Sequence, residues 1–257
     1  MSMAMLGVFI LWLGWFGFNA GSTMGAMNLS FTEVAATTTL AGAASAIAGM
    51  FTAWVIIGKP DVALTGGSTI AGLVAITAPT AFVENWAAVV IGLVAGLLYV
   101  LFVLLLDKLK LDDPVGAIPA HGLLGAWGTL SVGIFASPRL IEAAGAGKAG
   151  ILYGGGFTQL GIQAIGIIAV FAFVIISSGI VFGIIKATIG LRVSEEEEIQ
   201  GLDIGEHGMW GYPEQFASNL PPAIAIHYPP PGASVEDHKR LIKKEVDAVE
   251  KKVEEEV

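Results

Sequence analysis

Long apolar stretches separated by short polar connections make up most of the chain before residue 192. Six of them are long enough to cross a hydrocarbon core of about 30 Å as helices. They lie at residues 4–22, 33–57, 63–82, 86–106, 115–136 and 157–189. The pattern predicts an all-α polytopic membrane protein, with a transmembrane domain of six spans over residues 1–191.

For two of the six stretches, the sequence predicts where the helix lies in the membrane domain. The fourth stretch, 86–106, is apolar all round, which is typical of a scaffold helix that faces lipid. The sixth stretch, 157–189, would form roughly 50 Å of helix, so we expect it to tilt strongly or to protrude as an outer strut.

A water-facing tail follows the membrane domain. Residues 192–218 mix acids with aromatics and glycines, and we predict that they dock on cytoplasmic loops. Residues 219–233 contain five prolines and are predicted to form a linker. Residues 234–257 predict a charged helix, in which apolar side chains step by four and three residues: Ile242, Val246, Val249 and Val253. This spacing fits a short coiled-coil seam, and it also fits a single solvated helix.

Composition excludes several classes of protein. With 54% hydrophobic residues, 14% charged residues and a mean hydropathy of +0.75, the chain is too apolar to be a soluble domain. The formal net charge of -9 belongs mainly to the tail, where residues 195–198 are four consecutive glutamates. The absence of cysteine excludes disulfides, thiolate metal sites and cysteine nucleophiles. We expect no enzyme activity, no metal, no cofactor and no nucleic-acid partner.

Positive charges next to the spans predict the orientation of the chain. Five of these residues fall at one end of the predicted spans: Lys59, Lys108, Lys110, Lys186 and Arg192. The opposite end has only Arg139 and Lys148. Because positive charges collect on the cytoplasmic side, both termini are predicted to be cytoplasmic, in a multi-pass protein of the plasma membrane.

The fifth stretch carries an isolated histidine, His121, whose nearest ionisable neighbours along the chain are Asp113 and Arg139. A histidine at membrane depth costs free energy unless it faces a protein interior or a water path. Pro119 is expected to bend the helix just before it and to aim the imidazole inward. Two interpretations remain open: a pore residue that passes a small hydrogen-bonding solute or a proton, and a packing histidine bonded to a neighbouring carbonyl.

The start of the fifth stretch has a helix-opening pattern. Asp112 and Asp113 precede Pro114, and a carboxylate followed by proline is favourable at a helix N-terminus. We therefore interpret Asp112 as a helix cap and not as an ion ligand.

The end of the first stretch combines aromatic side chains with a hydroxyl. Trp15, Phe18 and Ser22 recur at i, i+3 and i+7, which places them on one face of an α-helix. Aromatic faces and a hydroxyl can hold a small cation by cation–π attraction and hydrogen bonding. The alternative is an aromatic belt at the membrane interface.

Four segments in this order resemble the ammonium transporters of the Amt/Mep/Rh family, and specifically the Amt branch. They are GWFGFNAGS at 14–22, AGLVAIT at 71–77, DDPVGAIPAHG at 112–122 and GLRVSEEEEIQGLDIGEHG at 190–208. The resemblance covers about residues 5–212. It implies a homotrimer in which each subunit has its own pore through eleven spans, of which this chain corresponds to the last six.

The resemblance also implies roles for individual residues. His121 matches the second of two pore histidines, and Phe18 matches one of two stacked gate phenylalanines. Trp15 matches the tryptophan beside the gate, and Ser22 matches the hydroxyl of an outer ammonium site. In the tail, Asp203, His207 and Tyr212 match a regulatory segment that couples subunits, on the side where PII-type regulatory proteins block family pores.

The chain departs from the family pattern in two ways. It enters its first apolar stretch within a few residues of Met1, so we expect that a first half is missing or is encoded separately. Gly67 and Ser68 stand where many family members have Asn and Gly, which leaves the pore lining from this stretch unassigned.

Three functions from different classes follow from these observations. The leading prediction is an ammonium or ammonia transporter or channel, with a pore lined by a histidine and gated by aromatics. The alternative is an ammonium sensor or scaffold that signals through its cytoplasmic tail. A third class, the aquaglyceroporins, is disfavoured because the sequence lacks paired Asn-Pro-Ala motifs.

Overall fold

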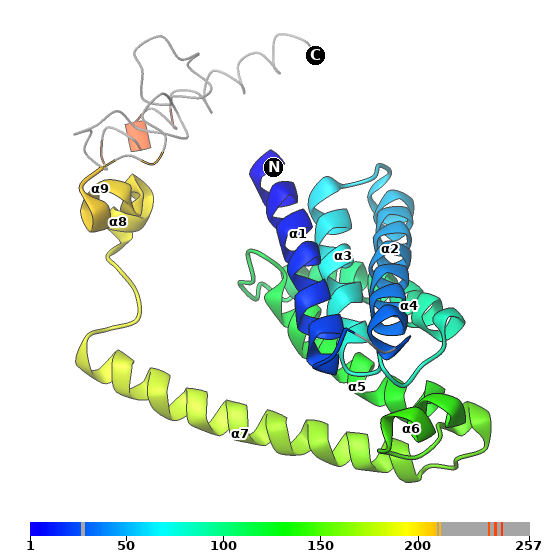
Figure 1. Cartoon of the computed structure of the whole chain (residues 1–257). Helices are drawn as coiled ribbons and strands as arrows, with labels where there is room; N and C mark the ends of the chain where they lie inside the picture. The colour runs from blue at the N-terminus through cyan, green and yellow to red at the C-terminus, as the bar shows by residue number, and fades with distance from the viewer. Residues whose placement is uncertain (27–28, 210, 212–235, 237–238, 241–242, 244–257) are drawn as a thin grey trace. The chain divides into compact units, whose positions relative to one another are not determined.

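The computed structural model describes residues 1–26, 29–209, 211, 236, 239–240 and 243. Apart from one isolated bridge between Val83 and Ala136, the regular structure of these residues is helical (Figure 1). The all-α fold class predicted from the sequence is therefore confirmed. The chain divides into two units, Met1–Ile175 and Ile176–Val257, and each is described by itself.

Apolar helices joined by short connections build the first unit. The main helices are α1 Ser2–Trp15, α2 Leu29–Ile57, α3 Val62–Thr77, α4 Asn85–Lys108, α5 Leu124–Phe135 and α7 Thr158–Thr188, which runs on into the second unit. Two π-helical segments, η1 Phe16–Ala20 and η3 Ile118–Leu123, continue α1 and precede α5. Shorter elements lie in the connections: η2 Gly21–Thr23, α6 Pro138–Ala144 and η4 Ile151–Tyr153.

Five helical segments among the described residues are long and apolar enough to cross a membrane: Ser2–Thr23, Leu29–Ile57, Asn85–Lys108, Ile118–Phe135 and Thr158–Thr188. The third stretch, expected over 63–82, forms the shorter helix α3 of 16 residues. Asp61 caps its start by accepting a 2.8 Å hydrogen bond from the Leu64 N–H. The helix ends at Thr77, one residue short of Pro79, although Ala78 between them keeps helical backbone angles of φ -70° and ψ -46°.

Close contacts between backbones hold α2, α3 and α4 together. A Cβ built on Gly92 of α4 would lie 2.3 Å from the Ala41 carbonyl oxygen of α2, and one on Gly96 would lie 2.2 Å from the Ser45 carbonyl oxygen. A Cβ on Gly72 of α3 would lie 2.7 Å from the same Ala41 oxygen. Small residues thus let the three helices approach closely, as in other membrane bundles.

The two faces of α4 differ in burial. The stretch 86–106 is expected to be a scaffold helix that faces lipid, and one apolar face of α4 is exposed, with Leu97 and Leu101. The other face is buried and includes Ile91, Tyr99 and Val100. An all-apolar helix has no polar side to mark which face is covered, and the glycines at the contacts with α2 are the available signal.

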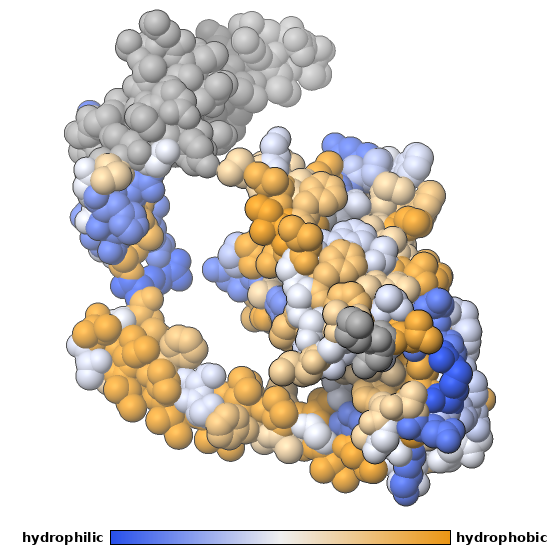
Figure 2. Space-filling view, in the orientation of Figure 1, coloured by the Kyte–Doolittle hydropathy of each residue, from blue (hydrophilic) through white to orange (hydrophobic). Residues whose placement is uncertain are grey.

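Helices α1 and α7 keep most of their apolar side chains uncovered. No residue of Ser2–Trp15 is buried, and Gln159 is the only buried residue of Thr158–Thr188. Figure 2 shows apolar side chains gathered on both helices. Exposed members include Phe9 and Leu13 on α1 and Ile165 and Phe171 on α7.

In the second unit, two short helices follow α7: α8 Glu195–Gln200 and α9 Leu202–His207. Ser194 opens α8 with a capping box, in which its hydroxyl accepts from the Glu197 N–H and the Glu197 carboxylate accepts from the Ser194 N–H. The predicted linker 219–233 lies outside the described residues, as does all of the predicted helix 234–257 except residues 236, 239–240 and 243.

Candidate functional site

The end of the first span departs from α-helical geometry at the residues predicted to hold a cation. Residues Phe16–Ala20 form a π-helical turn, and Ser22 lies in the 3-10 turn that follows. Asn19, which is buried, donates a 3.0 Å hydrogen bond from its side-chain amide to the Thr38 hydroxyl of α2. This bond fastens the turn to the packed helices. The i, i+3, i+7 pattern therefore does not continue along one regular helix face as far as Ser22.

Trp15 and Phe18 nevertheless lie side by side. Their ring centroids are 6.2 Å apart at an interplanar angle of 78°, an edge-to-face contact. The Trp15 indole N–H donates a 2.9 Å hydrogen bond to the Thr77 hydroxyl at the end of α3. This bond orients the indole from a second helix. The Ser22 hydroxyl donates to the Phe18 carbonyl in its own turn.

A π-helical segment also presents His121. Residues Ile118–Leu123 form this segment, in which the Leu124 N–H bonds to the carbonyl of Pro119. A π-bulge at a proline within a span is a recognised way of bending a helix. The imidazole is exposed, and no described residue forms a hydrogen bond with it. The interpretation as a packing histidine bonded to a carbonyl therefore has no support in the described part of the chain.

The cap of this segment is Asp113 and not Asp112. One carboxylate oxygen of Asp113 accepts a 2.8 Å bond from the Ala117 N–H, and the other accepts a 2.8 Å bond from the Ile118 N–H. The residue directly before Pro114 is the one placed to reach the free N–H groups of the first turn, which explains the shift by one residue.

Three cavities meet His121, and two of them contain its aromatic and polar neighbours. The first, which we call the aromatic cavity, has a volume of about 350 Å³ and is lined by Trp15, Phe18, Thr77, His121 and Thr129 among others. The second, which we call the tyrosine cavity, has a volume of about 620 Å³, and its polar lining residues are Asp107, Asp113, Tyr99 and His121. The structure thus brings His121, Trp15 and Phe18 together on one wall.

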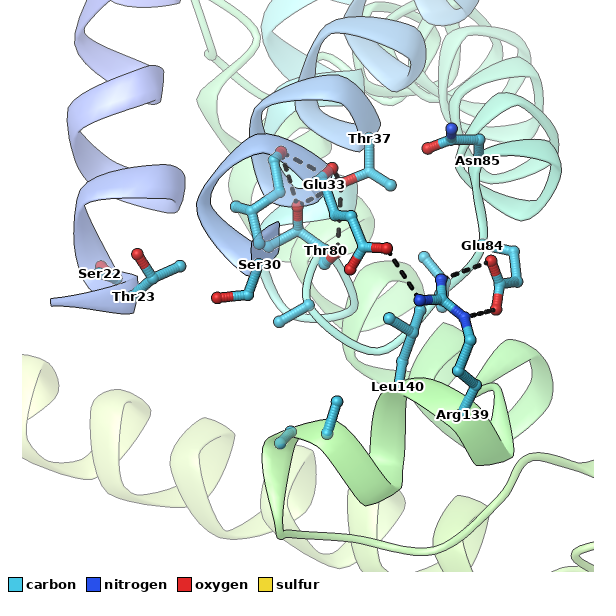
Figure 3. Close-up of a pocket in the computed structure, with 15 residues that line it drawn as sticks. Ser22, Thr23, Ser30, Glu33, Thr37, Thr80, Glu84, Asn85, Arg139 and Leu140 are labelled. Carbon is cyan, nitrogen blue, oxygen red and sulfur yellow. Dashed lines mark hydrogen bonds and ion pairs between the residues drawn. The ribbon is translucent and has the colours of Figure 1, made fainter. Parts of the chain in front are cut away.

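Ser22 lines a cavity of about 260 Å³ together with Phe18, and a separate cavity of about 380 Å³, which we call the carboxylate cavity. Figure 3 shows the Arg139 guanidinium between two carboxylates of this cavity, Glu33 at 2.8 Å and Glu84 at 3.0 Å. The Ser137 hydroxyl also donates to Glu84, at 2.7 Å. Hydrogen bonding to Arg139 holds the pKa of Glu84 below its usual value, and the Glu84 and Glu33 carboxylates raise the pKa of Arg139.

The carboxylate cavity fixes which helix ends lie together. Glu33 is near the start of α2, Glu84 precedes α4, and Arg139 follows α5. Because these ends meet in ion pairs, α2 and α4 run in the same direction and α5 runs in the opposite one. Asp113 and Tyr99 line the tyrosine cavity with His121. No group of three acidic or histidine side chains that could hold a metal ion occurs among the described residues.

A family model matches residues 1–212 of the chain, and its description is Ammonium Transporter Family. The chain belongs to this family. The resemblance predicted from the four sequence segments is therefore confirmed. Members of the family are transporters and not enzymes, in agreement with the expectation from the sequence.

Relatives in the Ammonium Transporter Family cover most of this chain. Ammonium transporter Amt2 of Archaeoglobus fulgidus is 47% identical over 216 residues, which are 83% of this chain and 46% of the relative. The ammonium transporter of Aquifex aeolicus is 40% identical over 80% of this chain and 47% of its own length. The chain spans about half the length of the curated relatives it matches.

Two solved structures support the same membership. A protein described as Sensor Amt Protein is 35% identical with a TM-score of 0.70, covering 79% of this chain and 48% of its own. Mep2 of Saccharomyces cerevisiae is 33% identical with a TM-score of 0.66, covering 71% of this chain and 43% of its own.

Sequence reasoning missed three polar side chains that line these cavities. Thr77 holds the Trp15 indole, and it was visible only as a member of the segment AGLVAIT. Tyr99 lies in an otherwise apolar helix, which hid it among lipid-facing positions. In the sequence, Arg139 is visible only as a positive charge beside a span, although in the structure it pairs with two carboxylates.

The predicted regulatory residues of the tail lie in the second unit. Asp203 is in α9, and its carboxylate accepts a 2.8 Å hydrogen bond from the Gly211 N–H. His207 ends α9 and is exposed. Tyr212 lies outside the described residues. The Asp203 bond closes a turn after α9, and it involves no other part of the chain.

Proposed function

We propose that this chain forms the second half of an ammonium or ammonia pathway across the membrane. The observation that carries the proposal is the place of His121, whose side chain lines both the aromatic cavity and the tyrosine cavity. A neutral imidazole can donate one hydrogen bond and accept another, which suits the passage of a small hydrogen-bonding solute. The membership in the Ammonium Transporter Family supports ammonium as that solute.

The charge of ammonium decides how it passes. Trp15 and Phe18 offer aromatic faces that attract a cation, and Ser22 contributes a hydroxyl oxygen nearby. A bare cation is expensive to bring into an apolar region, so ammonium gives up its proton, or hands it on, before the aromatic pair. Neutral ammonia then moves past Phe18, which acts as a gate, and along His121.

The first half of the pathway is supplied from outside these 257 residues. The exposure of His121 supports this step, because a polar side chain at membrane depth needs protein or water around it. We propose a homotrimer of such pores in the plasma membrane. The ends near Lys59 and Lys108 are placed on the cytoplasmic side, with both termini of this chain.

Uptake measurements with matched halves test this function. The chain is reconstituted into liposomes with the part of the Archaeoglobus fulgidus relative that it does not match, and methylammonium flux is measured. We expect flux with both parts together and none with either part alone. Absence of flux from a properly assembled pair would reject transport as the function.

A second candidate function is an ammonium sensor. The similarity to the protein described as Sensor Amt Protein favours it, together with a tail that extends beyond the family match at residue 212. In a sensor, ammonium would bind without net flux and alter the tail. Liposomes without flux, combined with ammonium-dependent protease sensitivity of residues 192–257, would favour the sensor over the transporter.

We also propose that the tail regulates the pore. Asp203, His207 and Tyr212 are the residues assigned to this role, in a segment that docks under the pore and couples subunits. The Asp203 bond to Gly211 supports a turn of defined shape in this segment. A PII-type protein is the proposed regulatory partner. Binding of such a protein to the intact chain, and its loss on Asp203→Ala, would test this assignment.

A further inference from the structure

A single tyrosine hydroxyl reaches between two glycines on the side of His121 away from Phe18. Tyr99 of α4 is only 4% exposed. A Cβ built on Gly67 of α3 would lie 2.1 Å from its hydroxyl oxygen, and one built on Gly116 would lie 2.3 Å away. Because real Cβ atoms do not approach so closely, the hydroxyl can occupy this place only while both positions are glycine.

This hydroxyl opens into the tyrosine cavity. Gly67, Gly116 and His121 line the cavity together with Tyr99. No described residue forms a hydrogen bond with the Tyr99 hydroxyl. Among the described residues, Ser68 Oγ is the only side-chain oxygen or nitrogen that is both unpaired and fully enclosed. The unpaired Tyr99 oxygen is therefore not fully enclosed and is accessible from the cavity.

The carboxylate of Asp113 bonds to the backbone and not to the Tyr99 hydroxyl. Both oxygens of Asp113 accept backbone N–H groups, those of Ala117 and Ile118. A buried phenol without a partner costs free energy, and native proteins rarely leave such a group unsatisfied. The unpaired donor thus points to an occupant of the cavity that accepts a hydrogen bond.

We propose that the Tyr99 hydroxyl is a second binding position for the transported solute, after His121 on the way to the end of α4. The solute class is a small neutral amine such as ammonia, whose nitrogen lone pair accepts a hydrogen bond from the phenol. Its N–H groups remain free to bond to the His121 imidazole or to water. No proton is transferred to or from Tyr99. This inference rests on the proposed function and adds a residue that guides the solute beyond the histidine.

Removal of one oxygen atom tests the inference. Tyr99→Phe keeps the ring and deletes only the hydroxyl, and we expect methylammonium flux through the reconstituted pore to fall about threefold to tenfold, the effect of one neutral hydrogen bond. The matched control is Tyr153→Phe, at a residue that is 37% exposed and does not line the tyrosine cavity. The control should conduct like the unmodified chain. Equal flux in Tyr99→Phe and the control would overturn the inference.

A stability measurement separates a lost binding position from a packing defect. Tyr99→Phe keeps every ring atom, so the unfolding temperature of the detergent-solubilised chain should stay unchanged while the flux falls. Gly67→Ala should lower the unfolding temperature, because its Cβ would lie 2.1 Å from the Tyr99 hydroxyl oxygen and 2.4 Å from the ring carbon that bears it. A loss of stability in Tyr99→Phe as large as that in Gly67→Ala would contradict the inference.

Fluorine resonances separate failure of this inference from failure of the proposed function. The chain is labelled with 3-fluorotyrosine, and the Tyr99 resonance is identified by its loss in Tyr99→Phe. We expect ammonium chloride, compared with sodium chloride at equal ionic strength, to shift the Tyr99 resonance and not that of Tyr153. A shift without any flux would reject transport and retain the binding position. Flux that depends on His121, without a shift and without an effect of Tyr99→Phe, would retain transport and reject the binding position.

Discussion

Helices α4 and α7 have similar apolar compositions but opposite surroundings. In α4, Gly92 and Gly96 bring the backbone against α2, and one side of the helix is buried. In α7, Gly166 and Gly183 have no neighbouring atom within 4 Å of a built Cβ, and Gln159 is the only buried residue. An apolar composition therefore predicts that a helix enters a membrane. The contacts of its glycines show whether another helix of the same chain packs against it.

Polar contacts at one end attach the less buried segments to the packed helices. The turn after α1 is fastened by Asn19 to Thr38 of α2. The connection from α5 to α7 is fastened by Arg139, which bonds to Glu33 and Glu84. The core of the bundle thus depends on close backbone packing, and hydrogen bonds and ion pairs add to the packing contacts that attach its outer helices, such as that of Gly133 with Leu160 of α7.

The largest expected effect comes from adding a methyl group at the centre of the packed region. Gly92→Ala forces a Cβ to within 2.3 Å of the Ala41 carbonyl oxygen unless α2 and α4 move apart. We expect a loss of about 1–3 kcal/mol in the free energy of unfolding, typical of overpacking. Thermal unfolding of the detergent-solubilised chain measures it.

Gly166→Ala in α7 is the matched control for this substitution. Its Cβ meets no atom of the described chain, so the unfolding temperature should not fall. Equal destabilisation by the two substitutions would contradict the difference in packing between α4 and α7. If Gly166→Ala lowers the unfolding temperature only when the first half is present, the partner of α7 lies outside this chain.

A smaller effect is expected where α1 is fastened. Asn19→Ala removes the donor to the Thr38 hydroxyl, which should cost about 1 kcal/mol and loosen the π-helical turn. Hydrogen exchange of residues 16–23 measures the loosening, with Thr39→Val as control because that exposed hydroxyl bonds only to the Ala35 carbonyl of its own helix. Unchanged exchange in Asn19→Ala would mean that other contacts hold the turn.

The smallest expected effect is the acid dependence of the Arg139 ion pairs. The pKa of Glu84 is lowered from its ordinary 4.5, mainly by hydrogen bonding to Arg139. The ionised Glu84 carboxylate therefore contributes its full stabilisation above pH 4.5. This stabilisation is lost as the pH falls through the lowered pKa of Glu84 in the folded chain. Glu84→Gln should slightly lower the unfolding temperature at neutral pH, and the difference from the unmodified chain should vanish well below pH 4.5. A difference that persists in acid would assign the effect to Ser137 or to packing.

Apolar stretches and motif order were enough to predict the helical membrane fold and the family. The motifs also predicted Trp15, Phe18, Ser22 and His121 as site residues, of which Trp15, Phe18 and His121 line one cavity while Ser22 lines others. These features follow from local sequence, because each span or motif carries its own signal of length, aromatic content or proline position.

The remaining features depend on contacts between distant segments. The π-helical turn at Phe16–Ala20 forms where Asn19 meets Thr38, and no α-helical spacing rule includes that contact. The place of the Tyr99 hydroxyl depends on glycines in two other segments, Gly67 and Gly116. The cap at Asp113 instead of Asp112 required the geometry of the first turn, which sequence spacing defines only to within a residue.

Ammonium flux through His121→Ala tests the central claim most directly. The chain and its first half are reconstituted together, and methylammonium flux is compared among the unmodified chain, His121→Ala and the control Thr39→Val. Because His121 lines both the aromatic and the tyrosine cavity, we predict that flux is lost or strongly altered in His121→Ala and unchanged in the control. Undiminished flux in His121→Ala, from a pore assembled as well as the unmodified one, would contradict the assignment of His121 to the pathway.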